Sequence, residues 1–261
     1  MKYSVIIPFY NQEGLVEETI LSVLSAIGQK DEVIAIDDHS TDSTWEKLNS
    51  LTNDDRLKIF RNEVNRRHVY TINRAAELSS GEVLILLGGD DILAKNFTKH
   101  LTSHFDAGAD IVFSPVKFFY NYNDIDVSET SNVPLKALSF NELLFGWGSI
   151  NGRKYSIIGC AIRKSSFSKL GGFSLSYIVE DHEFFLRAAL NRMNILMVSG
   201  AYSFYRQTSN SLSKNILKMI REDARIIFKL APTTLAIPAF CKRLSIFAIV
   251  FVRRLILRLK L

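Results

Sequence analysis

The sequence predicts an α/β protein whose mostly parallel sheet is flanked by helices and followed by a basic helical tail. Short β-branched runs alternate with helical patterns through the first hundred residues, as in strands joined by crossover helices. The 261 residues are 47% hydrophobic, which is enough to bury a sizeable core. Residues 216–261 hold 10 basic and 2 acidic side chains, although the formal charge of the whole chain is only +5. The basic character therefore belongs to the tail.

The elements of the first half of the chain are the clearest. The first helix has its apolar residues, among them Ile20, Val23 and Ile27, on one side. The fourth strand is apolar throughout, which is typical of a strand covered on both faces. We expect strands at 3–7, 32–36, 57–61 and 83–87, and helices at 13–27, 41–51 and 69–78.

The second half is less regular. A polar segment rich in Asn, Asp and Ser, residues 121–134, indicates a loop. Strands are expected at 111–119, 157–162 and 195–205, and helices at 140–145 and 181–191. From Ile216 onward the chain is predicted to be helical, with breaks at Pro232 and Pro238.

Several classes of protein are excluded by composition. Two cysteines, Cys160 and Cys241, are too few for a disulfide framework and lack the spacing of a zinc site. No secretory signal is expected at the start of the chain, and the apolar run at 244–252 is shorter than the roughly 20 residues that cross a bilayer. We therefore expect a cytoplasmic protein. No nucleic-acid partner is expected either, because residues 1–215 are net acidic and carry no known binding motif.

Polar residues follow three of the predicted strands. Tyr10 and Asn11 follow the first strand, Asp37 and Asp38 the second, and Asp90-Asp91 the fourth. Ligands of open α/β sheets bind at the carboxyl ends of the strands, so these groups are expected at one edge. Adjacent carboxylates without basic partners repel each other, and a divalent cation relieves that repulsion. Asp90-Asp91 therefore predicts a Mn²⁺ or Mg²⁺ site, with a nucleotide diphosphate as the metal's companion ligand.

The order of these motifs resembles the inverting glycosyltransferases of family 2, which have the Rossmann-like GT-A fold. The resemblance runs from Val5 to about Ser213. Residues 4–11 are similar to the opening strand and its nucleotide-contact loop, which implies donor contacts from Pro8 and Tyr10. Residues 36–44 are similar to the second-strand signature, in which Asp38 would bind the uracil edge. Arg67 resembles a nucleotide-contacting basic residue, although Arg66 competes for that role and a solvated surface arginine is an equal alternative.

The segment 86–91 resembles the family's metal-binding Asp-x-Asp motif, with Gly88 in place of the first aspartate. The resemblance implies that Asp90 contacts both metal and donor, with Asp91 beside it. Val179-Glu180-Asp181 looks like the acceptor-side motif, with Asp181 as general base and Glu180 and Arg187 nearby. A helix N-cap is the alternative interpretation of the acidic pair.

Tyr205-Arg206 is similar to the closing segment of the family, which implies that Arg206 contacts the diphosphate. The histidine expected after this pair is Thr208 here, and this departure, like Gly88, bears on metal dependence. The implied organisation is a GT-A domain over 1–215, with a nucleotide-sugar half at about 1–115 and an acceptor half at about 116–215. Residues 216–261 form the amphipathic tail.

The resemblance implies an enzyme that moves a sugar, with inversion, from a UDP-sugar to a hydroxyl of a glycan or lipid-linked glycan in bacterial polysaccharide assembly. The alternatives are a non-catalytic nucleotide-sugar-binding or assembly protein of the same fold and, less consistent with the length, a receiver-like domain. As one helix, the tail has its basic residues within an arc of roughly 160°. Residues 240–261 therefore predict peripheral binding to an anionic membrane, the inner face of the plasma membrane, or packing on protein instead. The residues of this arc are Lys242, Arg243, Arg253, Arg254, Arg258 and Lys260.

Overall fold

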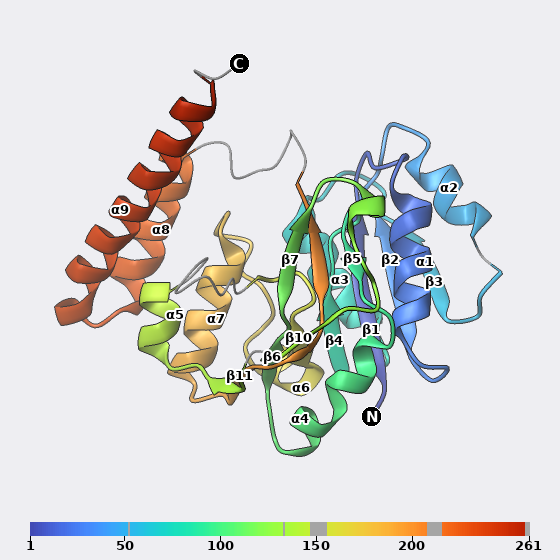
Figure 1. Cartoon of the computed structure of the whole chain (residues 1–261), viewed down its shortest axis with the longest axis horizontal. Helices are drawn as coiled ribbons and strands as arrows, with labels where there is room; N and C mark the ends of the chain where they lie inside the picture. Colours follow the sequence, from blue (N-terminus) through green and yellow to red (C-terminus); the bar gives the residue numbers. More distant parts are fainter. Residues whose placement is uncertain (52, 133, 147–155, 208–215, 259–261) are drawn as a thin grey trace.

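An eight-stranded sheet lies at the centre of the protein (Figure 1). The computed structural model describes residues 1–51, 53–132, 134–146, 156–207 and 216–258. The strand order is β3-β2-β1-β4-β10-β6-β11-β9, and β1 to β4 are parallel to one another. β10 is antiparallel to β4 and β6, and β6 pairs with β11 in parallel. The strands are β1 Tyr3–Phe9, β2 Glu32–Asp37, β3 Leu57–Arg61, β4 Val83–Leu86, β10 Ala161–Arg163, β6 Ile111–Phe113, β11 Ile195–Met197 and β9 Lys136–Ala137.

Each face of the sheet has its own hydrophobic core. Alternate residues of a strand point to opposite faces, so Ile6 lies in one core and Val5 and Ile7 lie in the other. The core that contains Val5 is covered by α1 Val16–Ala26, α2 Thr44–Ser50, η1 Phe97–His100 and α4 Thr102–Asp106. The core that contains Ile6 is covered by α3 His68–Leu78, α5 Phe140–Gly146, α6 Lys164–Lys169 and α7 Glu180–Leu190. The predicted α/β fold is confirmed.

Two long strands predicted in the second half are divided into shorter ones. The segment 111–119 forms β6 and β7 Val116–Phe119 in different sheets, because Pro115 has no N–H with which to continue the ladder. The segment 195–205 forms β11, β12 Gly200–Ala201 and β13 Ser203–Arg206, and Gly200 turns the chain at a φ of +120°. β13 pairs with β7 and with β5 Ile92–Leu93 in a three-stranded sheet. This second sheet extends the edge that carries the motifs.

The strand predicted at 157–162 is shorter and later than expected. The strand β10 covers Ala161–Arg163, and Gly159 and Cys160 just before it also form backbone hydrogen bonds with Leu86 of β4. Gly159, just before it, has a φ of +70°, and a Cβ there would lie 2.5 Å from the Cβ of Ser203. The turn at Gly159 thus brings the chain against β13. The loop predicted at 121–134 also contains a helical turn, η2 Tyr122–Asp124, and a two-residue strand, β8 Thr130–Ser131.

The tail forms two helices, α8 Ile216–Leu230 and α9 Thr233–Arg258, that lie side by side (Figure 1). Pro232 separates them as predicted, but Pro238 lies inside α9 and does not end it. Pro238 and Thr234 are both exposed, so water can satisfy the carbonyl group that the proline leaves unpaired. Ile226, Ile227 and two alanines of α9 are buried in the core that contains Ile6.

Candidate active site

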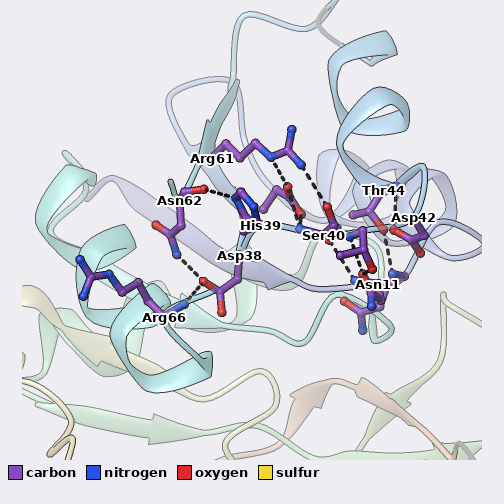
Figure 2. Close-up of polar contacts among 12 residues, drawn as sticks. Asn11, Asp38, His39, Ser40, Asp42, Thr44, Arg61, Asn62 and Arg66 are labelled. Carbon is purple, nitrogen blue, oxygen red and sulfur yellow. Dashed lines mark hydrogen bonds and ion pairs between the residues drawn. The ribbon is translucent and has the colours of Figure 1, made fainter. Parts of the chain in front are cut away.

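The loop after β2 holds two aspartates in different environments (Figure 2). Asp37 is fully buried, accepts the Ser40 N–H at 3.1 Å and pairs with Arg61 at 2.9 Å. Asp38 lies at the start of the loop, and its Oδ1 accepts Asn62 Nδ2 at 2.6 Å and the backbone N–H of Arg66 at 2.8 Å. Asp37 therefore stabilises the turn, whereas Asp38 is oriented toward the side of the loop where α3 begins.

A shallow pocket of about 310 Å³ lies between the loops that follow β2 and β3. It is lined by His39, Arg61, Asn62 and Glu63. His39 has a φ of +62°, a conformation that is uncommon for a residue other than glycine. Its Nδ1 lies 3.3 Å from the carbonyl oxygen of Asn62, so the β2 and β3 loops are tied together at the pocket.

The loop after β1 is fastened to the loop after β2. Asn11 donates its backbone N–H to Ser40 Oγ at 2.9 Å and accepts the Thr41 N–H on its side-chain oxygen at 2.9 Å. Pro8 is buried within β1, whereas Tyr10 is 46% exposed. The structure thus brings Tyr10 and the Asp38 loop to the same edge of the sheet, as expected.

The two arginines that competed for a nucleotide contact differ in what they touch. The backbone amide of Arg66 binds Asp38, and its guanidinium lies 5.3 Å from the centre of the Tyr70 ring. Arg67 is exposed at the N-terminus of α3 with a φ of +69°. A donor contact from the Arg67 side chain stays a prediction.

Asp90 and Asp91 follow β4 and converge on Gly88. Asp91 is 1% exposed, and its Oδ1 accepts the backbone N–H of Arg206 at 2.9 Å. Asp90 is partly exposed. Burial raises the pKa of Asp90, and burial followed by the charge of Asp90 raises the pKa of Asp91. A Cβ atom on Gly88 would lie 2.5 Å from Asp91 Oδ2 and 3.0 Å from Asp90 Oδ1. The two carboxylates therefore occupy the space where the family's first aspartate would begin.

This pair fits a divalent cation. Carboxylate oxygens are the ligands that Mn²⁺ and Mg²⁺ prefer, and Mg²⁺ commonly takes one or two of them together with phosphates. A cation would also offset the cost of burying both carboxylates and the effect of the Asp90 charge on Asp91. Within the described residues there is no group of three or more His, Cys, Asp or Glu side chains placed to hold a metal. Asp90 and Asp91 would thus hold the metal jointly with a diphosphate.

Arg206 is engaged by protein groups. Its Nε donates to the carbonyl oxygen of Asp90 at 2.8 Å, and its Nη2 pairs with Glu18 of α1. The guanidinium lies 4.4 Å from the centre of the Phe119 ring. These contacts position the Asp90 loop, and contact with a diphosphate stays a prediction. Thr208 lies outside the described residues.

The acidic pair at the start of α7 is strongly perturbed. Burial, and then the charge of Asp181, raise the pKa of Glu180 to about 8. Burial also raises the pKa of Asp181 to about 6, against the effect of the His182 N–H, which Asp181 Oδ1 accepts at 2.7 Å. The Nε2 atom of His68, on α3, lies 3.9 Å from Glu180 Oε1. The N-cap residue of the helix is Val179, whereas Glu180 and Asp181 are acidic residues of the first turn, where Asp181 accepts the His182 N–H.

Arg187 has a structural role in the same helix. It pairs with Glu183 through Nε and Nη2, at 2.9 Å and 2.8 Å, and Nη2 also donates to the Gly172 carbonyl oxygen at 2.9 Å. These contacts join the Gly171-Gly172 turn to α7. Contact with an acceptor stays a prediction for Arg187.

Sequence reasoning missed Tyr205. Burial, and then the charges of Asp91, Asp90 and Asp181, raise the pKa of its phenol, so this side chain lies near both acidic groups. Its ring packs on Phe118, with the ring centres 5.4 Å apart. The signal in the sequence is the Tyr205-Arg206 pair, whose tyrosine directly precedes the predicted diphosphate contact.

The mixed, mostly parallel sheet, with polar loops at the carboxyl ends of β1, β2 and β4, is the arrangement of the GT-A fold. Two solved structures share this fold. The structure of TarS from S. aureus in complex with UDP-GlcNAc has a TM-score of 0.65 and 21% identity, and the match covers 89% of this chain and 68% of that one. A mannosyltransferase from Pyrobaculum calidifontis, in complex with GDP-Man and Mn²⁺, has a TM-score of 0.64 and 16% identity over 92% and 68%.

The chain belongs to glycosyl transferase family 2, because the family's model matches residues 4–171. An uncharacterized glycosyltransferase of Haemophilus influenzae is 28% identical over 233 residues, 87% of each chain. A UDP-Glc:alpha-D-GlcNAc-diphosphoundecaprenol beta-1,3-glucosyltransferase of Escherichia coli is 26% identical over 223 residues, 84% of this chain and 82% of its own. The protein is therefore a family 2 glycosyltransferase, and the resemblance seen in its motifs is confirmed.

Proposed function

We propose that the protein transfers a sugar, with inversion, from a UDP-sugar to a hydroxyl of a lipid-linked glycan. The observation that carries this proposal is the position of Asp90 and Asp91, which follow β4 at the edge of the parallel sheet that also carries the Asp38 loop. Arg206 of β13 binds this loop, and β13 also carries Tyr205, whose pKa is raised by burial and then by the charges of Asp91, Asp90 and Asp181. That arrangement supports a direct transfer between donor and acceptor.

Asp181 is the proposed general base. An acceptor hydroxyl has a high pKa and must lose its proton as it attacks the anomeric carbon. With its pKa raised to about 6, Asp181 is ionised at neutral pH and is a stronger base than an ordinary aspartate. The new C–O bond forms on one face of the sugar while the bond to the diphosphate oxygen breaks on the other. This single displacement inverts the anomeric centre and needs no nucleophile from the enzyme.

Asp90 and Asp91 are the proposed ligands of Mn²⁺ or Mg²⁺. Such a metal, when bound, neutralises charge on the departing diphosphate. The contacts of Arg206 with Asp90 and Asp91 keep this loop in place. Asp38 is assigned to the uracil edge, because it follows β2 at the edge of the sheet that carries the motifs, and Asn62 and the Arg66 amide fix its carboxylate.

UDP-glucose and a GlcNAc-diphosphate lipid are the first substrates to test. The E. coli relative is named for this donor and this acceptor class, and the S. aureus neighbour was solved with UDP-GlcNAc. The full chain should transfer glucose from UDP-glucose, or N-acetylglucosamine from UDP-GlcNAc, and NMR of the product should show an inverted anomeric centre. A preference for GDP-mannose, or a retained configuration, would contradict the proposal. Binding of UDP without transfer would favour the non-catalytic alternative.

Asp181→Asn tests the assignment of the base. The loss of a positioned base should lower kcat by about 10²–10⁴-fold, and the KM for the donor should change little because Asp38 and Asp90 remain. Glu180→Gln is the matched comparison, since it changes the neighbouring carboxylate in the same way. Normal turnover by Asp181→Asn together with loss in Glu180→Gln would assign the base to Glu180.

We further propose that the tail holds the protein at an anionic membrane surface, which would be the cytoplasmic face of the plasma membrane. No helix among the described residues has both the length and the apolar character needed to span a bilayer. The exposed face of α9 supports surface binding, because its residues recur at helical spacing. These residues are Ile237, Cys241, Leu244 and Ala248.

The prediction that Arg243 belongs to the exposed basic face is wrong. Arg243 is 7% exposed and pairs with Asp223, because the preceding turns of α9 pack against α8. The side chains of Arg253, Arg254 and Arg258, and all of Lys260, lie outside the described residues. Arg243 therefore cannot contribute to a membrane contact while this packing holds.

Vesicle binding tests the exposed face. The full chain should bind vesicles that contain anionic lipid, and less strongly as salt rises, because salt screens contacts between basic residues and headgroups. Ile237→Asp with Leu244→Asp should release it, whereas Leu21→Asp, which changes an exposed apolar residue of α1 in the same way, should leave binding unchanged. Equal binding by the double variant would contradict the proposal.

A further inference from the structure

A chain of three buried ionisable residues connects the tail to the first turn of α7. His182 Nδ1 lies 3.0 Å from Asp223 Oδ1 on α8, and Asp223 Oδ2 accepts Arg243 Nε of α9 at 3.1 Å. The side chains of His182, Asp223 and Arg243 are 0%, 1% and 8% exposed. We call this chain the buried triad. Because its members come from three helices, it fixes α8 and α9 relative to α7.

The triad ends at the residue that holds Asp181. The backbone N–H of His182 donates to Asp181 Oδ1 at 2.7 Å, while the imidazole of the same residue is fastened to Asp223. The amide that orients the carboxylate is thus held from the tail. A movement of the His182 ring would move this amide and change the direction of the Asp181 side chain.

Stability alone is a poor reason for such a triad. Burying an ion pair removes two charges from water, and well-packed apolar residues of similar volume usually stabilise a protein as well or better. Elsewhere in this part of the chain, packing is apolar, with Ile226 and Ile227 of α8 fully buried. A charged network in that setting, in contact with the turn that carries Asp181, is better explained by a need to hold this turn in a fixed position.

We propose that His182, Asp223 and Arg243 are positioning residues, which hold the Asp181 carboxylate in the direction needed for proton transfer. This inference rests on the proposed function of Asp181 as general base. It gives the helical tail a second role besides surface binding, since α8 and α9 complete the support of the active site. Removing the tail would thus damage catalysis directly.

The electrostatic surroundings of Asp181 are consistent with this role. After burial and the His182 amide, the negative charge of Asp223 raises the pKa of Asp181 and the positive charge of Arg243 lowers it. The two tail residues thus act on the base in opposite directions. The other titratable groups that interact with Asp181 come from its own helix, from β13 and from the turn before β10. They are Glu180, Tyr205 and Cys160.

The test uses the full chain with the two tail members of the triad replaced by apolar residues. The double variant Asp223→Leu with Arg243→Met removes both tail charges together, so that no buried charge is left unpaired and the fold is preserved. Its kcat should fall by about 10–100-fold, as expected for a displaced catalytic group, with the donor KM unchanged. Hydrogen exchange at the His182 amide should become faster. Arg221→Met, which replaces an exposed arginine on the same helix, is the control and should leave both quantities unchanged.

Asp223→Asn supplies an independent measurement. Loss of this negative charge leaves Arg243 beside the base, so the acidic limb of the kcat profile should move to lower pH. If the double variant does not fold, the kcat profile of Asp223→Asn is the test: an acidic limb at the same pH as in the wild type overturns the inference. In a folded double variant, wild-type kcat overturns it, and so does a loss of kcat with unchanged exchange at His182. If the wild type transfers no sugar, the proposed function fails, and exchange at His182 alone decides whether the triad holds this turn.

Discussion

Replacing Gly88 by alanine should inactivate the enzyme without unfolding it. A Cβ atom at this position would lie 2.5 Å from Asp91 Oδ2, whereas ordinary contacts begin at 3.4 Å. Asp91 is buried and accepts the Arg206 N–H, so its carboxylate has little room to turn away. It must move by about 0.9 Å, the difference between the two distances. A misplacement of about 1 Å near the reacting groups can lower the rate about 100-fold.

The assay compares kcat and the Mn²⁺ requirement of Gly88→Ala with those of the wild type. Weakening the bond between Asp91 and the Arg206 amide should lower the free energy of unfolding by only about 1–3 kcal/mol, so the variant should still fold. Gly14→Ala is the matched control, because a Cβ there meets no atom within 4 Å. Wild-type kcat and metal requirement in a folded Gly88→Ala would refute this reasoning. Gly88→Asp, which restores the first aspartate of the family motif, should also lose activity.

Three further predictions concern single side chains. Asn62→Ala removes the hydrogen bond from Asn62 to the Asp38 carboxylate. Because a hydrogen bond to a charged group contributes about 1.5–3 kcal/mol, the Kd for UDP measured by calorimetry should rise at least about tenfold. An unchanged Kd would contradict the role of Asp38. The acidic limb of kcat should lie near pH 6, with activity lost below it as Asp181 is protonated; a limb near pH 4 would contradict the buried environment of this group. Burial opposes ionisation of Glu32, but hydrogen bonds from Lys58, Ser4 and Ser80 lower its pKa to about 2. The ionised side chain should therefore stabilise the fold above pH 4.5, and this stabilisation should be lost as the pH falls from 4.5 to 2. Glu32→Gln should flatten the unfolding free energy over this range, and a slope that persists would assign it to other groups.

The sequence by itself determined the sheet and the placement of the motifs. Apolar runs of strand length, alternating with helical periodicity, predicted the four parallel strands within one or two residues. Because the motifs follow those strands directly, their meeting at one edge followed from chain order. Asp38 and Asp90 could therefore be chosen as candidates without coordinates, and Asp181 was chosen from its resemblance to the acceptor-side motif of the family. The choice of each residue depends on a short local motif, which can be read from the sequence alone.

Only the tertiary structure decided what the other charged residues contact. Arg206 and Arg187 looked available for ligands, yet they are paired with Glu18 and Glu183. Arg243 looked like part of a basic face, yet it is buried against Asp223, 20 residues earlier. Helical periodicity places a residue on a side of its helix but does not say which other helix covers that side. That depends on contacts between distant segments, and these also bring His182 and the tail to the base.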